Sequence, residues 1–222
     1  MILEFSEELL SIKKKLETIP SKHRLAFCAA ISQRMLPVYN TYAKEESSAQ
    51  PELFQIALDE IWQILAGKLL EIDKLKQLLE SCDEAYPQID DYSTSKWAID
   101  AQGAGIVICY TLEYAIEQDI KCAGQTLTAA HNCIYEHLDA LISENEDILG
   151  EELLKKGSEL IDNHPLTIRE MKKENEDFQR LKETKILDRK LLKWLYTSSC
   201  DEGKILLGLY HNIFPDLYSN QE

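Results

Sequence analysis

Residues 96–112, KWAIDAQGAGIVICYTL, decide the fold class of this chain. Over residues 97–112 the stretch is apolar on nearly every side of a helix, and Asp100 is its one charged residue. A helix of this kind is covered by neighbouring elements on most of its sides. The small residues 103–105 would let a neighbouring backbone approach closely. We therefore predict a central buried helix, over about 94–118, inside an all-helical bundle.

Helical periodicity continues on both sides of this segment. Apolar residues recur at intervals of three and four, as on one face of a helix, most clearly from Ile120 to Leu141. Further helices are expected at 3–18, from Ser21, from Pro51, around 72–79, between 143 and 165, after Pro165 and from Ser199. The sequence shows no alternating strand pattern, no convincing repeat and no clear linker. These features predict one all-α domain over residues 1–222, a bundle of about eight or nine helices.

Several local signals predict where these helices begin, bend and face solvent. Pro37 should kink or break the second helix, because proline removes a backbone donor and clashes with the preceding turn. Thr167 and Glu170 have capping-box spacing in the helix expected after Pro165, and Ser199 and Glu202 form a second capping-box pattern that should open a last helix. Residues 172–185, KKENEDFQRLKETK, contain only two large apolar side chains. We expect this part of the helix after Pro165 to be largely exposed.

Charge and cysteine content limit the partners and the compartment. The chain carries 24 basic and 39 acidic residues, a formal net charge of −15. A surface this acidic repels phosphate backbones and anionic lipids, so we expect neither nucleic acid nor a membrane as a partner. A basic protein would be attracted. The N-terminus lacks the features of a signal peptide, and the six cysteines form no CxxC pair, which predicts reduced thiols in a cytoplasm.

The sequence carries none of the common cofactor motifs. It has no GxxxxGK[ST] loop, no GxSxG elbow and no HExxH pair. The segment HNCIYEH, residues 131–137, holds two histidines and a cysteine, but on a helix positions 131 and 133 point about 200° apart, and positions 131 and 137 about 240° apart. We expect no metal and no cofactor, with His131 and His137 at the surface or lining a groove and Cys133 in the core.

Two carboxylates in apolar stretches, Asp59 in IALDEIWQIL and Asp100 in WAIDAQGAGIVI, are the candidate site residues. A buried carboxylate must be paired, hydrogen-bonded or protonated. Arg34, just before Pro37, is the matching cation. We predict that Arg34 bridges to Asp59, Asp100 or both as a buried tie between helices. Two alternatives are a polar pocket for a small ligand or an ion, and simple exposure of these groups.

Asp90 and Asp91 have a plainer interpretation. They precede the predicted helix start near Thr94, where negative charge favours the positive end of the helix dipole. We therefore interpret them as an acidic loop at a helix start.

A second acidic region has the character of a binding surface. From Glu136 to Asp162 the chain has nine acids and two bases, whereas from Arg169 to Lys193 it has nine bases and six acids. An acidic patch steers a basic partner electrostatically. The predicted partner-facing patch consists of Glu136, Asp139, Glu144, Glu146, Asp147, Glu151 and Glu152.

Three blocks in order, SQRMLPVYNTY (32–42), IALDEIWQIL (56–65) and KWAIDAQGAGIVI (96–108), resemble the bacterial YjaG-like family, which is defined by a domain of unknown function. The similarity covers about residues 20–195. Gln33 stands where an acidic residue is common, and WAIDA replaces a more usual PALDA. The resemblance implies an all-helical bacterial cytoplasmic protein and suggests that Arg34, Asp59 and Asp100 belong to a shared signature. It supplies no activity, cofactor or catalytic residue.

Two functions from different classes fit the sequence. The first, which we favour, is a non-enzymatic acidic protein-binding module, for instance an immunity-type inhibitor of a basic partner. The second is a small-ligand- or metal-binding enzyme or carrier that uses a polar pocket at Arg34, Asp59 and Asp100.

Overall fold

The computed structural model describes residues 5–88, 95–145 and 156–210, which contain nine α-helices and no strand. The helices are α1 (Phe5–Leu16), α2 (Ser21–Glu45), α3 (Pro51–Leu65), α4 (Ile72–Ala85), α5 (Ala98–Glu117), α6 (Ile120–Glu144), α8 (Gly157–Asp162), α9 (Pro165–Glu183) and α10 (Arg189–Tyr210). No helix in these ranges is both long enough and apolar enough to cross a bilayer. The predicted all-α fold is confirmed.

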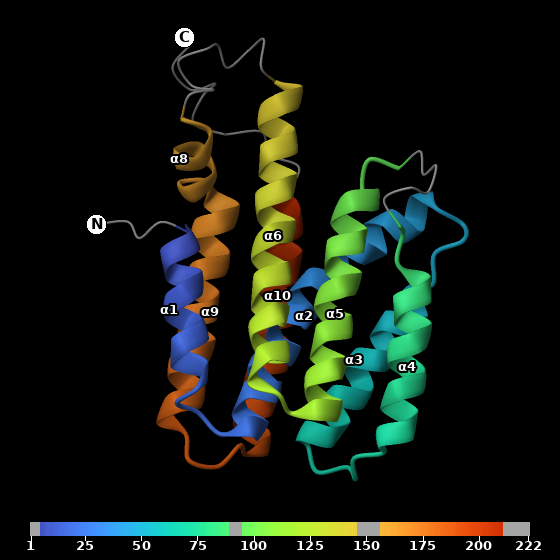
Figure 1. Cartoon of the computed structure of the whole chain (residues 1–222), viewed down its shortest axis with the longest axis vertical. Helices are drawn as coiled ribbons and strands as arrows, with labels where there is room; N and C mark the ends of the chain where they lie inside the picture. Colours follow the sequence, from blue (N-terminus) through green and yellow to red (C-terminus); the bar gives the residue numbers. More distant parts are fainter. Residues whose placement is uncertain (1–4, 89–94, 146–155, 211–222) are drawn as a thin grey trace.

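Helix α5 lies at the centre of the bundle, as its apolar sequence predicts. It packs most extensively against α6 and α2 and also contacts α4 and α3. Figure 1 shows it between α6 and α4. Described structure resumes at Ser95, and the helix begins at Ala98 rather than near Thr94. The hydroxyl of Ser95 accepts a hydrogen bond from the backbone N–H of Trp97, just before the helix starts.

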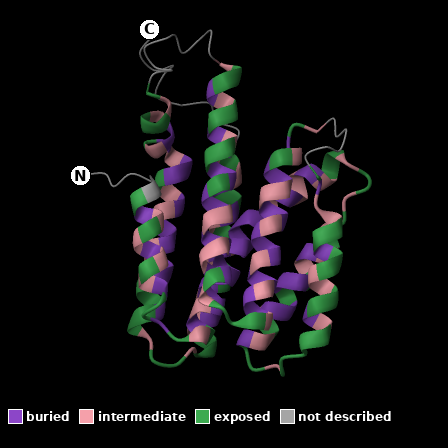
Figure 2. Cartoon of the chain, in the orientation of Figure 1, coloured by how far each residue is buried: buried purple, intermediate pink, exposed green. Residues whose placement is uncertain are grey.

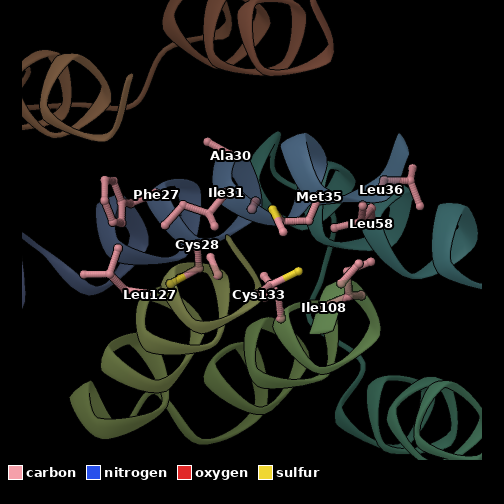
Figure 3. Packing of buried hydrophobic residues seen from close by; sticks show 14 of the residues in the cluster. Phe27, Cys28, Ala30, Ile31, Met35, Leu36, Leu58, Ile108, Leu127 and Cys133 are labelled. Atoms are coloured by element: carbon pink, nitrogen blue, oxygen red, sulfur yellow. The ribbon is translucent and has the colours of Figure 1, made fainter. Parts of the chain in front are cut away.

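Helix α2 is a second buried element that the sequence does not single out. Every residue from Leu25 to Leu36 is buried, so this helix is covered on all sides over three turns. In Figure 2 it forms the purple centre of the molecule. Figure 3 shows Cys28, Ile31 and Met35 on the side of α2 that faces α5 and α6. The core therefore sits where α2, α5 and α6 meet.

Of the kink or break predicted at Pro37, the break does not occur, because α2 continues through this residue to Glu45. Helix α10 packs against this part of α2 through Gly203. A Cβ atom on Gly203 would lie 2.8 Å from the Arg34 carbonyl oxygen and 3.2 Å from Cγ of Pro37. Close packing on both sides of the proline favours the helical backbone and outweighs the lost backbone hydrogen bond.

The two capping boxes do not mark helix starts. Helix α9 begins at Pro165, and its cap is the side chain of His164, which accepts a hydrogen bond from the Leu166 N–H. Ser199 lies in the middle of α10, which begins ten residues earlier, at Arg189. Tertiary packing keeps α10 helical through this position, so the cap that the sequence offers there is not used.

The charged middle of α9 is buried along one side, contrary to the expected exposure of residues 172–185. Lys173, Glu174 and Asp177 are all buried, together with Glu170 one turn earlier. The expectation fails because it equates charge with exposure. A charged side chain can be buried when it is paired, and each of these groups has a partner on its own or another helix.

Candidate functional site: buried charges and an acidic surface

The strongest polar feature of the core is an ion-paired arginine. Arg34 projects from α2 toward α9, where its Nε–H donates to both carboxylate oxygens of Glu170 at 2.9 Å. Its Nη1–H donates to Oδ2 of Asp177 at 2.8 Å. The three side chains are fully buried. Burial alone would lower the pKa of Arg34, but the charges of Glu170 and Asp177 reverse this effect and raise it, so the guanidinium stays charged.

Two further pairs extend this arrangement along α9. The Lys173 ammonium pairs with Asp177, one turn away on the same helix, and lies 4.5 Å from the ring centroid of Trp194 on α10. Nε2 of His131 on α6 lies 2.9 Å from a carboxylate oxygen of Glu174. We call these charged groups the core charge network: Arg34, His131, Glu170, Lys173, Glu174 and Asp177. The network joins α9 to α2 and α6, and the contact of Lys173 with Trp194 joins α9 to α10.

Two opposing effects act on the pKa of the Asp177 carboxyl group in this network. Burial raises its pKa, because the charged form loses hydration inside the protein. The nearby charges of Arg34 and Lys173 act in the opposite direction and favour the carboxylate. Losing either cation would therefore leave a buried acid with too little compensation.

Asp100 is buried, as its apolar surroundings predict, but its partner is a histidine. Its Oδ2 lies 3.0 Å from Nδ1 of His137 on α6. Nε2 of the same ring lies 3.0 Å from the backbone carbonyl of Tyr210, at the end of α10. Trp97 stacks on the ring with a centroid distance of 6.3 Å. This group ties α5, α6 and α10 together.

The structure corrects part of the interpretation of HNCIYEH. His131 is buried against Glu174, rather than at the surface or in a groove. Cys133 lies in the core, as expected, but it is four residues from His137 and therefore shares a helical face with it. The Cys133 thiol donates to the carbonyl of Asp100 at 3.6 Å. Within the ranges described, no three or more His, Cys, Asp or Glu side chains are placed to hold a metal ion.

The predicted bridge from Arg34 to Asp59 or Asp100 is wrong. Arg34 points toward α9, Asp100 pairs with His137, and Asp59 is exposed on α3, where it accepts from the Gln55 amide at 2.8 Å. No hydrogen bond or ion pair joins any two of these three residues, all of which lie in the described ranges. The next residue on α3, Glu60, takes the buried position instead and pairs with Lys68 and Lys74.

A pocket of about 290 Å³ lies elsewhere, at the end of the bundle where α2 begins and α3 and α5 end. None of the three predicted site residues lines it. Its floor and rim include Ser21, Lys22, Leu25, Ile64, Leu65 and Gln118. The backbone of Gln118 has φ of 56°, a left-handed conformation common at helix C-termini, and its side chain accepts from the Ser21 hydroxyl at 3.0 Å.

Five of the six cysteine thiols are buried, and that of Cys200 is half-buried. All six cysteines are free. Burial raises the pKa of Cys28 and of Cys82 to about 12, so both are protonated at neutral pH. The thiolate is the nucleophilic form of cysteine. These thiols therefore act as small apolar core groups.

The predicted partner-facing patch is described only in part. Glu136, Asp139 and Glu144 are exposed along the outer side of α6, and we call them the α6 patch. Its other predicted members, Glu146, Asp147, Glu151 and Glu152, lie outside the described residues, as do Asp90 and Asp91.

A second acidic group, which sequence reasoning missed, lies between neighbouring helices. Asp83 on α4 and Glu113 and Glu117 on α5 form what we call the α4–α5 cluster. Burial raises the pKa of Glu113, and the like charges of Glu117 and Asp83 raise it further. No cation offsets these effects within the described part of the chain. The four-residue spacing of Glu113 and Glu117 is the signal that could have identified the pair.

Comparisons with known proteins agree with the fold. A family model described as "Protein of unknown function (DUF416)" matches residues 11–210. An uncharacterised protein of Haemophilus influenzae is 30% identical over 152 residues, which cover 62% of this chain and 74% of the relative. The uncharacterised protein YjaG of Escherichia coli is 24% identical over 200 residues, covering 89% of this chain and 95% of the relative.

A solved structure shows the same architecture. The crystal structure of a DUF416 family protein from Shewanella baltica superposes with a TM-score of 0.72 at 18% identity, covering 85% of this chain and 93% of that chain. The resemblance to YjaG-like proteins is confirmed over a longer range than the three sequence blocks indicate. The chain belongs to the DUF416 family, a group of helical proteins of unknown function.

Proposed function

We propose that this protein is a non-enzymatic binding module whose acidic surface docks a basic protein partner in the cytoplasm. The observation that carries the proposal is the α4–α5 cluster. There Asp83, Glu113 and Glu117 are held together although their mutual repulsion and partial burial disfavour the charged form of Glu113. A lysine or arginine from a partner would relieve this repulsion. The complex would therefore contain a favourable ion pair that the free protein does not have.

The distribution of charge through the molecule supports the same conclusion. The core charge network pairs its acids with Arg34, Lys173 and His131 inside the protein, so these groups are not available to a partner. The net charge of −15 is carried largely at the surface, where it attracts basic proteins and repels nucleic acid. An immunity-type inhibitor of a basic protein is one concrete form of such a module.

The alternative, a ligand- or metal-binding enzyme or carrier at Arg34, Asp59 and Asp100, has no supporting geometry. Arg34 and Asp100 use their polar atoms in separate buried pairs, and Asp59 faces solvent. The pocket lies at another place in the bundle.

Capture from the native host tests the proposal. The purified protein is immobilised, exposed to host extract at low salt, washed with rising salt, and the eluate is identified by mass spectrometry. We expect a stoichiometric basic protein that leaves as the salt rises, because screening weakens contacts between exposed charges.

Three variants locate the docking surface. One neutralises the α4–α5 cluster, with Asp83→Asn, Glu113→Gln and Glu117→Gln. A second neutralises the α6 patch, with Glu136→Gln, Asp139→Asn and Glu144→Gln. The matched control removes the same charge elsewhere, with Glu17→Gln, Glu52→Gln and Glu159→Gln, all exposed residues. The proposal expects the first variant to lose the partner while the control keeps it. Equal loss in all three, or no salt-sensitive protein with wild type, would count against it.

A further inference from the structure

The end of the bundle that holds the pocket also carries the most exposed large apolar side chain in the described chain. Leu69, in the connection between α3 and α4, is 84% exposed. Its neighbour Leu70 lines the pocket, and Ile72 at the start of α4 is 43% exposed. Figure 1 shows this connection, the start of α2 and the junction of α5 with α6 at the same lower end of the molecule. An apolar projection and an apolar hollow therefore lie side by side.

The pocket suits an apolar side chain in shape and lining. Leu25, Ile64 and Leu65 give it an apolar floor, and its volume is about 290 Å³. Exposed apolar groups beside such a hollow mark interaction surfaces in monomeric proteins. A large apolar anchor inserted into a pocket is the usual centre of a protein interface.

Charges at this end have both signs, unlike those of the α6 patch. Lys22 on the rim and Lys121 nearby are exposed cations. The exposed acids are Glu71, next to Leu70, and Glu117 and Asp119, on either side of Gln118. When a surface binds a second copy of itself, the cations of one copy must face the acids of the other. The α6 patch, which consists of acids alone, would repel a second copy, whereas this end offers complementary charges to one.

We propose that this end of the bundle is a homodimer interface in which Leu69 of each copy enters the pocket of the other. A two-fold interface joins the same patch on both subunits, so the projecting group and the hollow that receives it must both belong to one surface. The lysines and carboxylates around the pocket would then pair across the two-fold axis. This inference is tested separately from the proposed function, because its test changes Leu69 and Lys22, which belong to neither acidic docking surface.

Sedimentation of the full chain at physiological salt tests the interface. Over about 1–500 µM, wild type is expected to pass from monomer to dimer with a dissociation constant on the order of 10 µM. Leu69→Glu should raise that constant at least about tenfold, since it places a charge in an apolar pocket. Lys22→Glu should raise it too, because the acids of the partner copy lose a cation.

The matched control is Ile186→Glu, which changes an equally exposed apolar residue, 77% exposed, between α9 and α10. It should dimerise like wild type. Far-UV circular dichroism checks that each variant keeps its helices, as expected for substitutions at exposed positions. A monomer at every concentration would overturn the inference. A dimer equally tolerant of Leu69→Glu and Ile186→Glu would overturn it as well, because the interface would then lie elsewhere.

Discussion

Glu60 and Glu113 show that neighbouring charges decide whether an ionised glutamate stabilises or destabilises this fold. Glu60 is buried, which by itself would raise its pKa, but hydrogen bonds from Lys68 and Lys74 lower it overall. Glu113 is also shielded from water, but its neighbours are Glu117 and Asp83, and its pKa is raised. Ionised Glu60 therefore stabilises the fold, whereas ionised Glu113 destabilises it.

Replacing Glu60 by glutamine should lower the free energy of unfolding at neutral pH by about 1 kcal/mol, because two lysines lose their charged partner. The folded-state pKa of Glu60 lies below its unfolded value, so its contribution is complete above the unfolded pKa and is lost as the pH falls through the folded pKa. Urea unfolding of both proteins should show the full difference at neutral pH, and the difference should shrink as the pH falls below about 4. A difference that persists in acid would contradict the ion pairing.

Replacing Glu113 by glutamine should have the opposite sign and raise the free energy of unfolding at neutral pH by about 0.5 kcal/mol, the typical cost of a like-charge pair four residues apart. The folded-state pKa lies above the unfolded value, so the folded state binds the proton more tightly and loses stability as the pH rises. The same urea titration should show the gain vanish below about pH 4. A destabilised variant would mean that the Glu113 carboxylate has a favourable partner.

Replacing Arg34 by methionine should cost about 3–5 kcal/mol, because Glu170 and Asp177 would remain buried without their shared cation. Arg180→Met is the comparison, since this α9 arginine pairs with Glu176 at the surface and lies 3.8 Å from the ring centroid of Trp194, and its loss should cost about 1 kcal/mol. Denaturant unfolding measures both. Similar small losses for the two variants would show that the core charge network does not hold α9 in place.

At the scale of the elements, the hydrophobic pattern predicts where the helices lie, but it does not predict which helix faces are buried when those faces carry charges. The all-apolar surroundings of α5 identify it as central, and the structure agrees. The inner face of α9 follows the same three- and four-residue spacing, but Glu170, Glu174 and Asp177 occupy it alongside Phe178 and Leu181. The three- and four-residue spacing of these positions is that of one helix face. A search for apolar residues misses this face, because three of its members are acids that are buried only with partners from other helices.

Gly203 of α10 tests the packing of two elements directly. Gly203→Ala should lower the free energy of unfolding by about 1–3 kcal/mol, because its Cβ would press on the backbone of α2 at Arg34 and force the helices apart. Gly208→Ala, five residues further along α10, has open space around its Cβ and should raise stability by about 1 kcal/mol through helix propensity. Thermal unfolding of the two variants should move in opposite directions. Shifts of the same sign would contradict the close contact between α10 and α2.

At the scale of the molecule, the contacts that pair the buried charges connect distant parts of the chain. Arg34 lies 136 residues from Glu170 and 143 from Asp177, so no local pattern indicates which acids it meets. The sequence shows that a buried arginine needs carboxylates, and it offers 39 acidic residues as candidates. Topology selects among them by placing α9 beside α2. The same folding places Glu113 beside Glu117 and Asp83, with no offsetting cation among the described residues, a feature that net charge alone cannot locate.

The central claim is that the α4–α5 cluster binds a basic partner. The most direct test is the association rate of the captured partner, measured as a function of salt concentration. With the α4–α5 cluster neutralised, we predict association about tenfold slower than wild type at low salt, and rates that converge as salt screens the charges. The control that loses Glu17, Glu52 and Glu159 should associate much more like wild type. Equal rates for wild type and the neutralised cluster at low salt would contradict the claim.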